Sequence, residues 1–184
     1  MNYLDLYNKN GYFTLENIYS LSEIMMMKDI IKNLDLNKYE HSKDKSVYPF
    51  RITNIIPKNE KLKKIVEKPK ILSILKECIG DDVIFFKDKY VAKEPDGKDF
   101  VAHVDGAFIT YNYRLKKETP GWWTYASKFI HLQIMVTDNT EENGCLRICK
   151  RESSDPYYYI KKYFLNDRSI KSGLTDPKFF SEIK

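Results

Sequence analysis

The chain has 184 residues and a formal net charge of +5, with 42% hydrophobic and 31% charged residues. This length suffices for one domain with its own core, and the composition is that of a globular protein. No window is apolar enough for a membrane helix, and the N-terminus lacks the basic start and apolar core of a signal peptide. We therefore expect a single domain over residues 1–184 that is cytoplasmic and not attached to a membrane.

Charge and cysteine usage exclude two further classes of protein. Lysine is spread along the chain, arginine is scarce, and the densest basic run, residues 58–70, also contains glutamates. A nucleic-acid site would need clustered cations, so no nucleic-acid partner is expected, although this run could still serve as a basic interaction surface. The three cysteines are odd in number and match no zinc motif, which excludes a disulfide framework and a structural zinc site.

The sequence begins with a predicted short strand over residues 11–14, followed by a helix. Ser20 and Glu23 have the spacing of a capping box, in which each side chain bonds the backbone of the other residue. Apolar residues then recur at helical spacing as far as Leu34. A further strand is predicted from Tyr48 to Ile56.

Two more helices are predicted before the pattern changes. Leu62, Ile65 and Val66 indicate a short helix, which ends before Pro69 because the residue preceding a proline avoids helical dihedral angles. Pro69 can itself begin the next helix, and Gly80 is suited to cap its end.

From residue 83 onward the apolar pattern becomes extended. Strands are predicted at four places: 83–93, 100–106, 129–136 and 145–149. Residues 111–127 form a longer excursion, and residues 155–184 are expected to form loops and helical turns. The sequence therefore predicts an α+β fold, mainly β, with N-terminal helices packed on antiparallel sheets.

His103 and Asp105 are the candidate metal ligands. In an extended strand, residues i and i+2 point to the same face, so an imidazole nitrogen and a carboxylate oxygen project side by side. This pair of ligands suits Fe(II), Mn(II) or Zn(II). A lone His-x-Asp pattern also occurs by chance, so the assignment depends on the rest of the chain.

The order of short motifs along the chain supports the metal site. Phe-Lys-Asp-Lys at 86–89 is followed by Lys-Glu-Pro-Asp-Gly at 93–97, by His103-x-Asp105-Gly106, and by Thr-Glu-Glu-Asn-Gly-Cys-Leu at 140–146. This order resembles the phytanoyl-CoA dioxygenase family of Fe(II)- and 2-oxoglutarate-dependent oxygenases. The resemblance runs from about residue 11 to about residue 149.

The resemblance implies a double-stranded β-helix, a cupin-like jelly roll with N-terminal helices packed on one sheet. It implies Fe(II) and 2-oxoglutarate as cofactors, with His103 and Asp105 as two arms of an iron triad, and a small organic molecule as the substrate that is hydroxylated. Lys89 and Gln133 fall at family positions that contact 2-oxoglutarate, although a solvated sheet face is an equal alternative for Lys89. His131 shares the strand face of Gln133. Its role stays open between a neighbour of the cofactor, a metal ligand and a core histidine.

Two departures from the family pattern qualify this prediction. The family's Gly-Ser-His loop is missing after Leu146, and no histidine follows His131, so the third iron ligand and the arginine that holds the 2-oxoglutarate carboxylate are not identified. Three explanations stay open: a truncated enzyme without its C-terminal strands, a relative that binds a small ligand or a partner without iron chemistry, and a triad completed by His131. An unfinished jelly roll would leave sheet edges unpaired, which predicts low stability or pairing with another chain.

The excursion has a candidate role of its own. Residues 111–128, with Trp122 and Trp123, are where a loop covering the substrate would lie, and ordinary packing is an equal alternative. The sequence leaves the substrate and the oligomeric state open.

Overall fold

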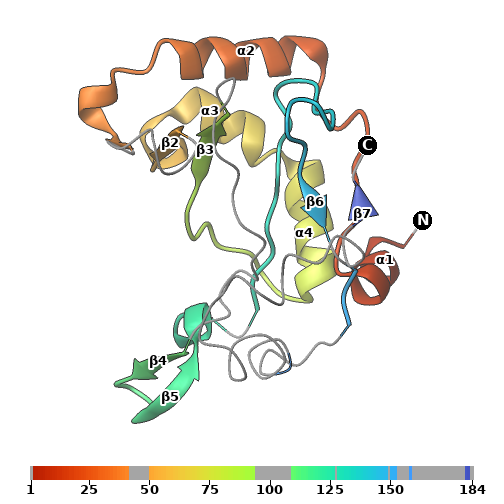
Figure 1. The fold of residues 1–184 in the computed structure, drawn as a ribbon, viewed down its shortest axis with the longest axis vertical. Coiled ribbons are helices and arrows are strands. Elements are labelled where there is room, and N and C mark those ends of the chain that lie inside the picture. Colours follow the sequence, from red (N-terminus) through yellow and green to blue (C-terminus); the bar gives the residue numbers. More distant parts are fainter. Residues whose placement is uncertain are drawn as a thin grey trace.

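The computed structural model describes residues 2–41, 50–93, 109–126, 128–148, 150–152, 158 and 181–182. Four α-helices lie in its first half (Figure 1): α1 (Tyr3–Asn10), α2 (Leu21–Lys32), α3 (Glu60–Val66) and α4 (Pro69–Ile79). Three short 3-10 helices accompany them: η1 (Leu36–Lys38), η2 (Ile56–Lys58) and η3 (Gly121–Thr124). In the part of the chain that the structure describes, no helix is long and apolar enough to cross a membrane.

The strands pair into three small antiparallel sheets. The first has the order β1-β2-β3 and contains β1 (Glu40–His41), β2 (Phe50–Thr53) and β3 (Lys89–Ala92). The second is the hairpin of β4 (Ile109–Asn112) and β5 (Lys117–Pro120), and the third pairs β6 (Arg147–Ile148) with β7 (Ser181–Glu182). In Figure 1 the hairpin and η3 lie at the lower left, away from α2 and α3.

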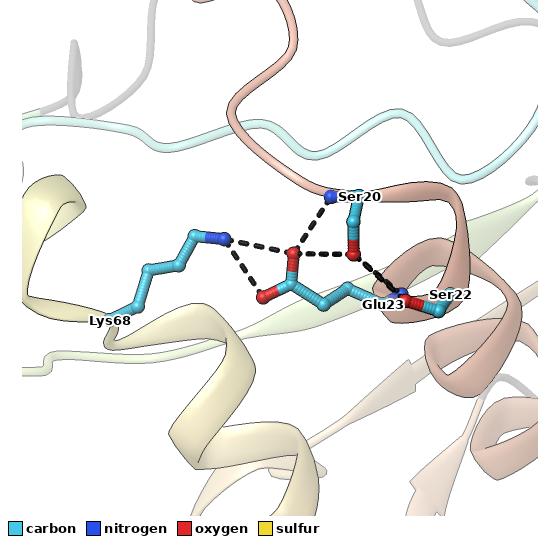
Figure 2. Close-up of polar contacts among 4 residues, drawn as sticks. All are labelled: Ser20, Ser22, Glu23 and Lys68. Atoms are coloured by element: carbon cyan, nitrogen blue, oxygen red, sulfur yellow. Dashed lines mark hydrogen bonds and ion pairs between the residues drawn. The ribbon is translucent and has the colours of Figure 1, made fainter.

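The predicted helix ends are confirmed around α2 and α4. The Ser20 backbone N–H donates to Glu23 Oε2 at 2.7 Å, and the Glu23 N–H donates to Ser20 Oγ at 3.3 Å, which completes the capping box (Figure 2). Pro69 begins α4, and Gly80 ends it with φ +75°, a left-handed conformation that favours glycine.

The capping box also joins two helices. Lys68, which precedes α4, donates from Nζ to both carboxylate oxygens of Glu23, at 2.8 and 2.9 Å (Figure 2). These bonds, together with the Ser20 backbone, lower the pKa of Glu23 to about 2. Lys68 Nζ also lies 4.8 Å from the centroid of the Tyr19 ring, and burial raises the pKa of Tyr19 to about 12. The start of α2 is therefore held to the start of α4 by charge.

The core lies between the first sheet and helices α2 and α3. Its buried side chains are Met27, Ile52, Ile55, Leu62 and Ile65, each at most 8% exposed. Half-buried side chains from the later part of the chain complete it, among them Tyr90, Ile134 and Val136. The polar run that enters β3 is also tied in, because Asp88 Oδ2 accepts the backbone N–H groups of Ile55 and Ile56 at 2.8 and 3.2 Å.

Several predicted strands are shorter than expected. Among the described residues of each run, strand pairing is limited to β3 in 83–93, to β2 in 48–56 and to β6 in 145–149. Residues 129–136 are extended without strand pairing. The small sheets are compatible with a jelly roll, but the double-stranded β-helix itself stays a prediction.

Three expectations about local structure are corrected. The strand predicted over residues 11–14 is absent, because Gly11 takes φ +82° and ends helix α1, which begins at an Asn2 cap. The excursion 111–127 contains a hairpin, in which Asn112 Oδ1 accepts the N–H groups of Arg114 and Leu115 and so shapes the turn. Residues 155–184 were not expected to hold a strand, yet β7 pairs with β6 because backbone pairing needs no apolar signature in the sequence.

Candidate active site

The predicted site residues divide into two groups. His103 and Asp105, the candidate iron ligands, lie outside the described residues, and their role stays a prediction. Lys89, His131 and Gln133, the candidate cofactor residues, are described. Among the side chains that the structure places, no three His, Cys, Asp or Glu side chains gather closely enough to hold a metal ion.

Lys89 is the first residue of strand β3, and its side chain points away from the core. It lies opposite Thr53 of β2, and its side chain is exposed. From residue 87 to residue 93 the side chains alternate between exposed and half-buried. Asp88 and Tyr90 take the inward positions, Asp88 bonded to the backbone of η2 and Tyr90 packed on the core. Because residues i and i+2 share a face, these two inward anchors fix Lys89 outward.

His131 and Gln133 lie on the outward side of a second extended run. Between residues 131 and 136 exposed and half-buried side chains alternate strictly. Ile134 and Val136 face the core, while His131, Gln133 and Met135 are exposed. Gln133 Nε2 lies 3.9 Å from Met135 Sδ, in keeping with one shared face. The shared face is thus confirmed, and the alternative of a core histidine for His131 is wrong.

The two runs cover the same core and turn the candidate cofactor residues away from it. We call the exposed positions of the two runs, taken together, the outward face: Lys87, Lys89, Val91, Lys93, His131, Gln133 and Met135. It combines cations, an imidazole and an amide with two apolar side chains. Such a face can bind a carboxylate through charge and through N–H donors.

The turn that follows the second run meets the end of β3. Asn143 Oδ1 accepts the Thr140 N–H at 2.8 Å, and Gly144 has φ +78°. Lys93 Nζ donates to the Gly144 carbonyl oxygen at 2.7 Å. Asn143 and Gly144 therefore serve to shape a structural turn. The contact joins two short motifs that lie far apart in the sequence.

The carboxylate of this turn is held in its charged form. Hydrogen bonds from the Thr140 side chain and from the backbone of Glu142 lower the pKa of the Glu142 carboxyl. Glu142 is exposed, and both of these hydrogen bonds lie within the turn itself.

Sequence reasoning missed the surroundings of Lys87. Lys87 Nζ lies 3.5 Å from the centroid of the Trp122 ring, and the Phe86 ring lies beside Trp122, with centroids 5.8 Å apart. Trp122 therefore packs against the run that leads into β3. The available signal was the alternation Lys87-Asp88-Lys89, which places two cations on one face, but the aromatic partner comes from a distant segment.

The comparison with known families identifies the class of protein. The sequence model described as phytanoyl-CoA dioxygenase (PhyH) matches residues 7–152. This match covers more than half of the chain, and it includes the outward face and the segment with His103 and Asp105. The chain belongs to the phytanoyl-CoA dioxygenase family.

Three curated proteins are similar to parts of the chain. "Dioxygenase lolE1" of Epichloe uncinata is 36% identical over 76 residues, 41% of this chain and 25% of the relative. "2-aminoethylphosphonate dioxygenase" of Uncultured bacterium HF130_AEPn_1 is 27% identical over 99 residues, 53% of this chain and 33% of the relative. "Probable alpha-ketoglutarate-dependent hypophosphite dioxygenase" of Stutzerimonas stutzeri is 23% identical over 154 residues, 76% of this chain and 49% of the relative.

These matches support membership of the family, but they do not identify the particular reaction. The chain spans between a quarter and about half of the length of these relatives. No solved structure matches the chain.

Proposed function

We propose that the chain carries an Fe(II)- and 2-oxoglutarate-dependent dioxygenase site that hydroxylates a small organic substrate. The observation that supports it most is the outward face. Two separate runs turn Lys89 and Gln133, the positions at which family members contact 2-oxoglutarate, to the side away from the core.

The residues on this face fit the acid part of the cofactor. Lys89 would pair with a carboxylate of 2-oxoglutarate as a point charge, and Gln133 would donate its amide N–H to a cofactor oxygen. His131 lies one strand step from Gln133 and would donate a ring N–H beside it. Val91 and Met135, the apolar members of the face, would limit access of water.

The proposed metal ligands are His103 and Asp105, whose residue types suit Fe(II). Iron and 2-oxoglutarate supply oxidation by dioxygen, a chemistry that protein side chains lack. The chain's own part is to bind both groups and to hold the substrate next to them. Two relatives are named for small substrates, 2-aminoethylphosphonate and hypophosphite, and we propose a small molecule for this chain as well.

Iron binding and turnover test the proposal separately. Anaerobic equilibrium dialysis with Fe(II) is expected to show one bound ion per chain, lost in His103→Ala and Asp105→Ala. Asp81→Ala, which removes an exposed carboxylate elsewhere, serves as the matched control and should bind normally. With 2-oxoglutarate and oxygen the iron-loaded chain should release succinate. Iron binding or succinate release that survives Asp105→Ala would contradict the assignment.

A binding module without iron chemistry is the second candidate function. It is favoured by the segment after Leu146, Arg147 to Ser154, which departs from the Gly-Ser-His loop of the family. It predicts that the chain binds a small ligand but neither retains Fe(II) nor releases succinate. A triad completed by His131 predicts instead that His131→Ala abolishes iron binding as fully as His103→Ala does.

A further inference from the structure

An aromatic cluster with a lysine on it lies where the run that carries Lys87 and Lys89 begins. Phe86 is its centre, with ring centroids 5.8 Å from Trp122, 5.5 Å from Tyr125 and 5.2 Å from Phe129. Lys87 Nζ lies 3.5 Å from the Trp122 ring centroid and 5.5 Å from that of Phe86. Phe86 is 43% exposed and Tyr125 is 74% exposed. The cluster therefore presents apolar surface and a cation together.

The cluster is adjacent to the proposed cofactor residues along both runs. Lys87 precedes Lys89 by two residues, and Phe129 precedes His131 by two residues. Two residues of extended chain span about 6.5–7 Å. Two independent runs thus place the cluster one side-chain step from the positions proposed to hold 2-oxoglutarate.

The alternation of the extended run places the acidic side chain near the cluster and the basic side chains on opposite sides of the backbone. Asp88 points inward and is bonded to the backbone N–H groups of Ile55 and Ile56. Lys87 and Lys89 point outward. Lys87 is a second cation beside Lys89, and its Nζ lies over the Trp122 ring. An aromatic face orients an ammonium without neutralising its charge.

We propose that Lys87 and this aromatic cluster form the substrate subsite and select a substrate in which an anionic group is joined to an apolar portion. The apolar portion would cover the Phe86 and Tyr125 rings, and the anionic group would pair with Lys87. This inference rests on the proposed function, because it takes the outward face as the cofactor site. The cluster also attaches η3 to the run before β3, and a purely structural role would include no preference for ligand charge.

Intrinsic fluorescence tests the subsite, because the Trp122 ring is part of the cluster, and the chain's other tryptophan, Trp123, is its neighbour in the sequence. The probes are cyclohexanecarboxylate, the neutral cyclohexanecarboxamide and acetate, titrated into the full chain without iron or 2-oxoglutarate. The carboxylate should bind about five- to tenfold more tightly than the amide, as expected for a partly desolvated ion pair. Acetate, which lacks the apolar portion, should bind most weakly.

Variants separate a charge-selective subsite from a packing role. Lys87→Gln should abolish the preference for the carboxylate, Lys87→Arg should retain it, and Lys61→Gln, which removes an exposed lysine of α3, should leave it unchanged. A carboxamide that binds as tightly as the carboxylate, a preference that survives Lys87→Gln, or no fluorescence response to the carboxylate would each overturn the proposal. Iron dialysis is independent of this titration, so a chain with the preference but without iron binding would refute the proposed function alone.

Discussion

The two faces of the same extended runs differ in almost every property. The inward side chains of residues 87–93 and 131–136 are half-buried. Tyr90, Ile134 and Val136 pack on the core, and Asp88 bonds the backbone of η2. Outward side chains are exposed and mostly cationic or polar. One face therefore stabilises the fold and the other is available for chemistry. This difference indicates that the alternation of exposed and half-buried side chains locates the candidate site better than any single motif does.

The largest expected loss of stability comes from substitutions in the core that these runs cover. Ile52 is 2% exposed, so Ile52→Ala should lower the free energy of unfolding by about 2–5 kcal/mol, because it removes buried methyl groups and leaves a cavity. Urea denaturation measures this change. On the later run, Ile134→Ala should be more destabilising than Met135→Ala. Equal effects of these two neighbours would contradict the division into two faces.

Asp88 and Lys89 provide the sharpest contrast between adjacent residues. Asp88→Ala leaves the N–H groups of Ile55 and Ile56 without their acceptor and should cost about 2–3 kcal/mol of stability. Lys89→Ala changes an exposed side chain and should cost less than about 0.5 kcal/mol. Thermal denaturation of the two variants, side by side, measures both. A strongly destabilising Lys89→Ala would mean that Lys89 serves the fold and not a ligand.

The turn that meets the outward face should show a smaller effect. Gly144→Ala should cost about 1 kcal/mol, because Gly144 has φ +78° and a Cβ there would lie 2.6 Å from Lys93 Nζ. The Lys93 side chain is flexible and can move aside, so the backbone conformation provides most of the cost. The same loss should appear in Gly144→Ala made on a Lys93→Ala background. If Gly144→Ala is not destabilising on the Lys93→Ala background, the cost comes from the contact with Lys93 and not from the backbone conformation.

Far from both faces, the Glu23–Lys68 pair should make stability depend on pH. The folded-state pKa of Glu23 is lowered to about 2, so its contribution is present above the ordinary carboxyl pKa and is lost as the pH falls toward 2. The urea midpoint of the wild type should therefore decrease more between pH 6 and pH 3 than that of Glu23→Gln. Parallel pH profiles of the two proteins would contradict this linkage.

Local chemistry made the helices predictable. The Ser20–Glu23 capping box, Pro69 at the start of α4 and Gly80 at its end are signals that act within a few residues, and the structure contains all three. The strands were less predictable because their pairing depends on distant partners. Residues 129–136 show the alternation of a strand but pair with none in the described part of the chain, and β7 has no sequence signature at all.

For the candidate site, the sequence predicted only which residues of an extended run share a face. Alternation correctly placed His131 with Gln133, and the inward anchors Asp88 and Tyr90 explain why Lys89 faces outward. The aromatic cluster at Lys87 could not be foreseen, since it joins two segments that lie far apart in the sequence, 86–87 and 122–129. His103 and Asp105 lie outside the described residues, so their pairing remains a prediction of the motif.

The affinity for 2-oxoglutarate tests most directly the claim that the outward face is the cofactor site. Anaerobic titration of the Fe(II)-loaded chain should produce an absorbance band that saturates with 2-oxoglutarate. Lys89→Met should weaken the midpoint by about tenfold or more, the effect of removing a charge partner from a carboxylate. Lys61→Met, on the exposed side of α3, should leave it unchanged. A midpoint for Lys89→Met equal to that of the wild type would contradict the account.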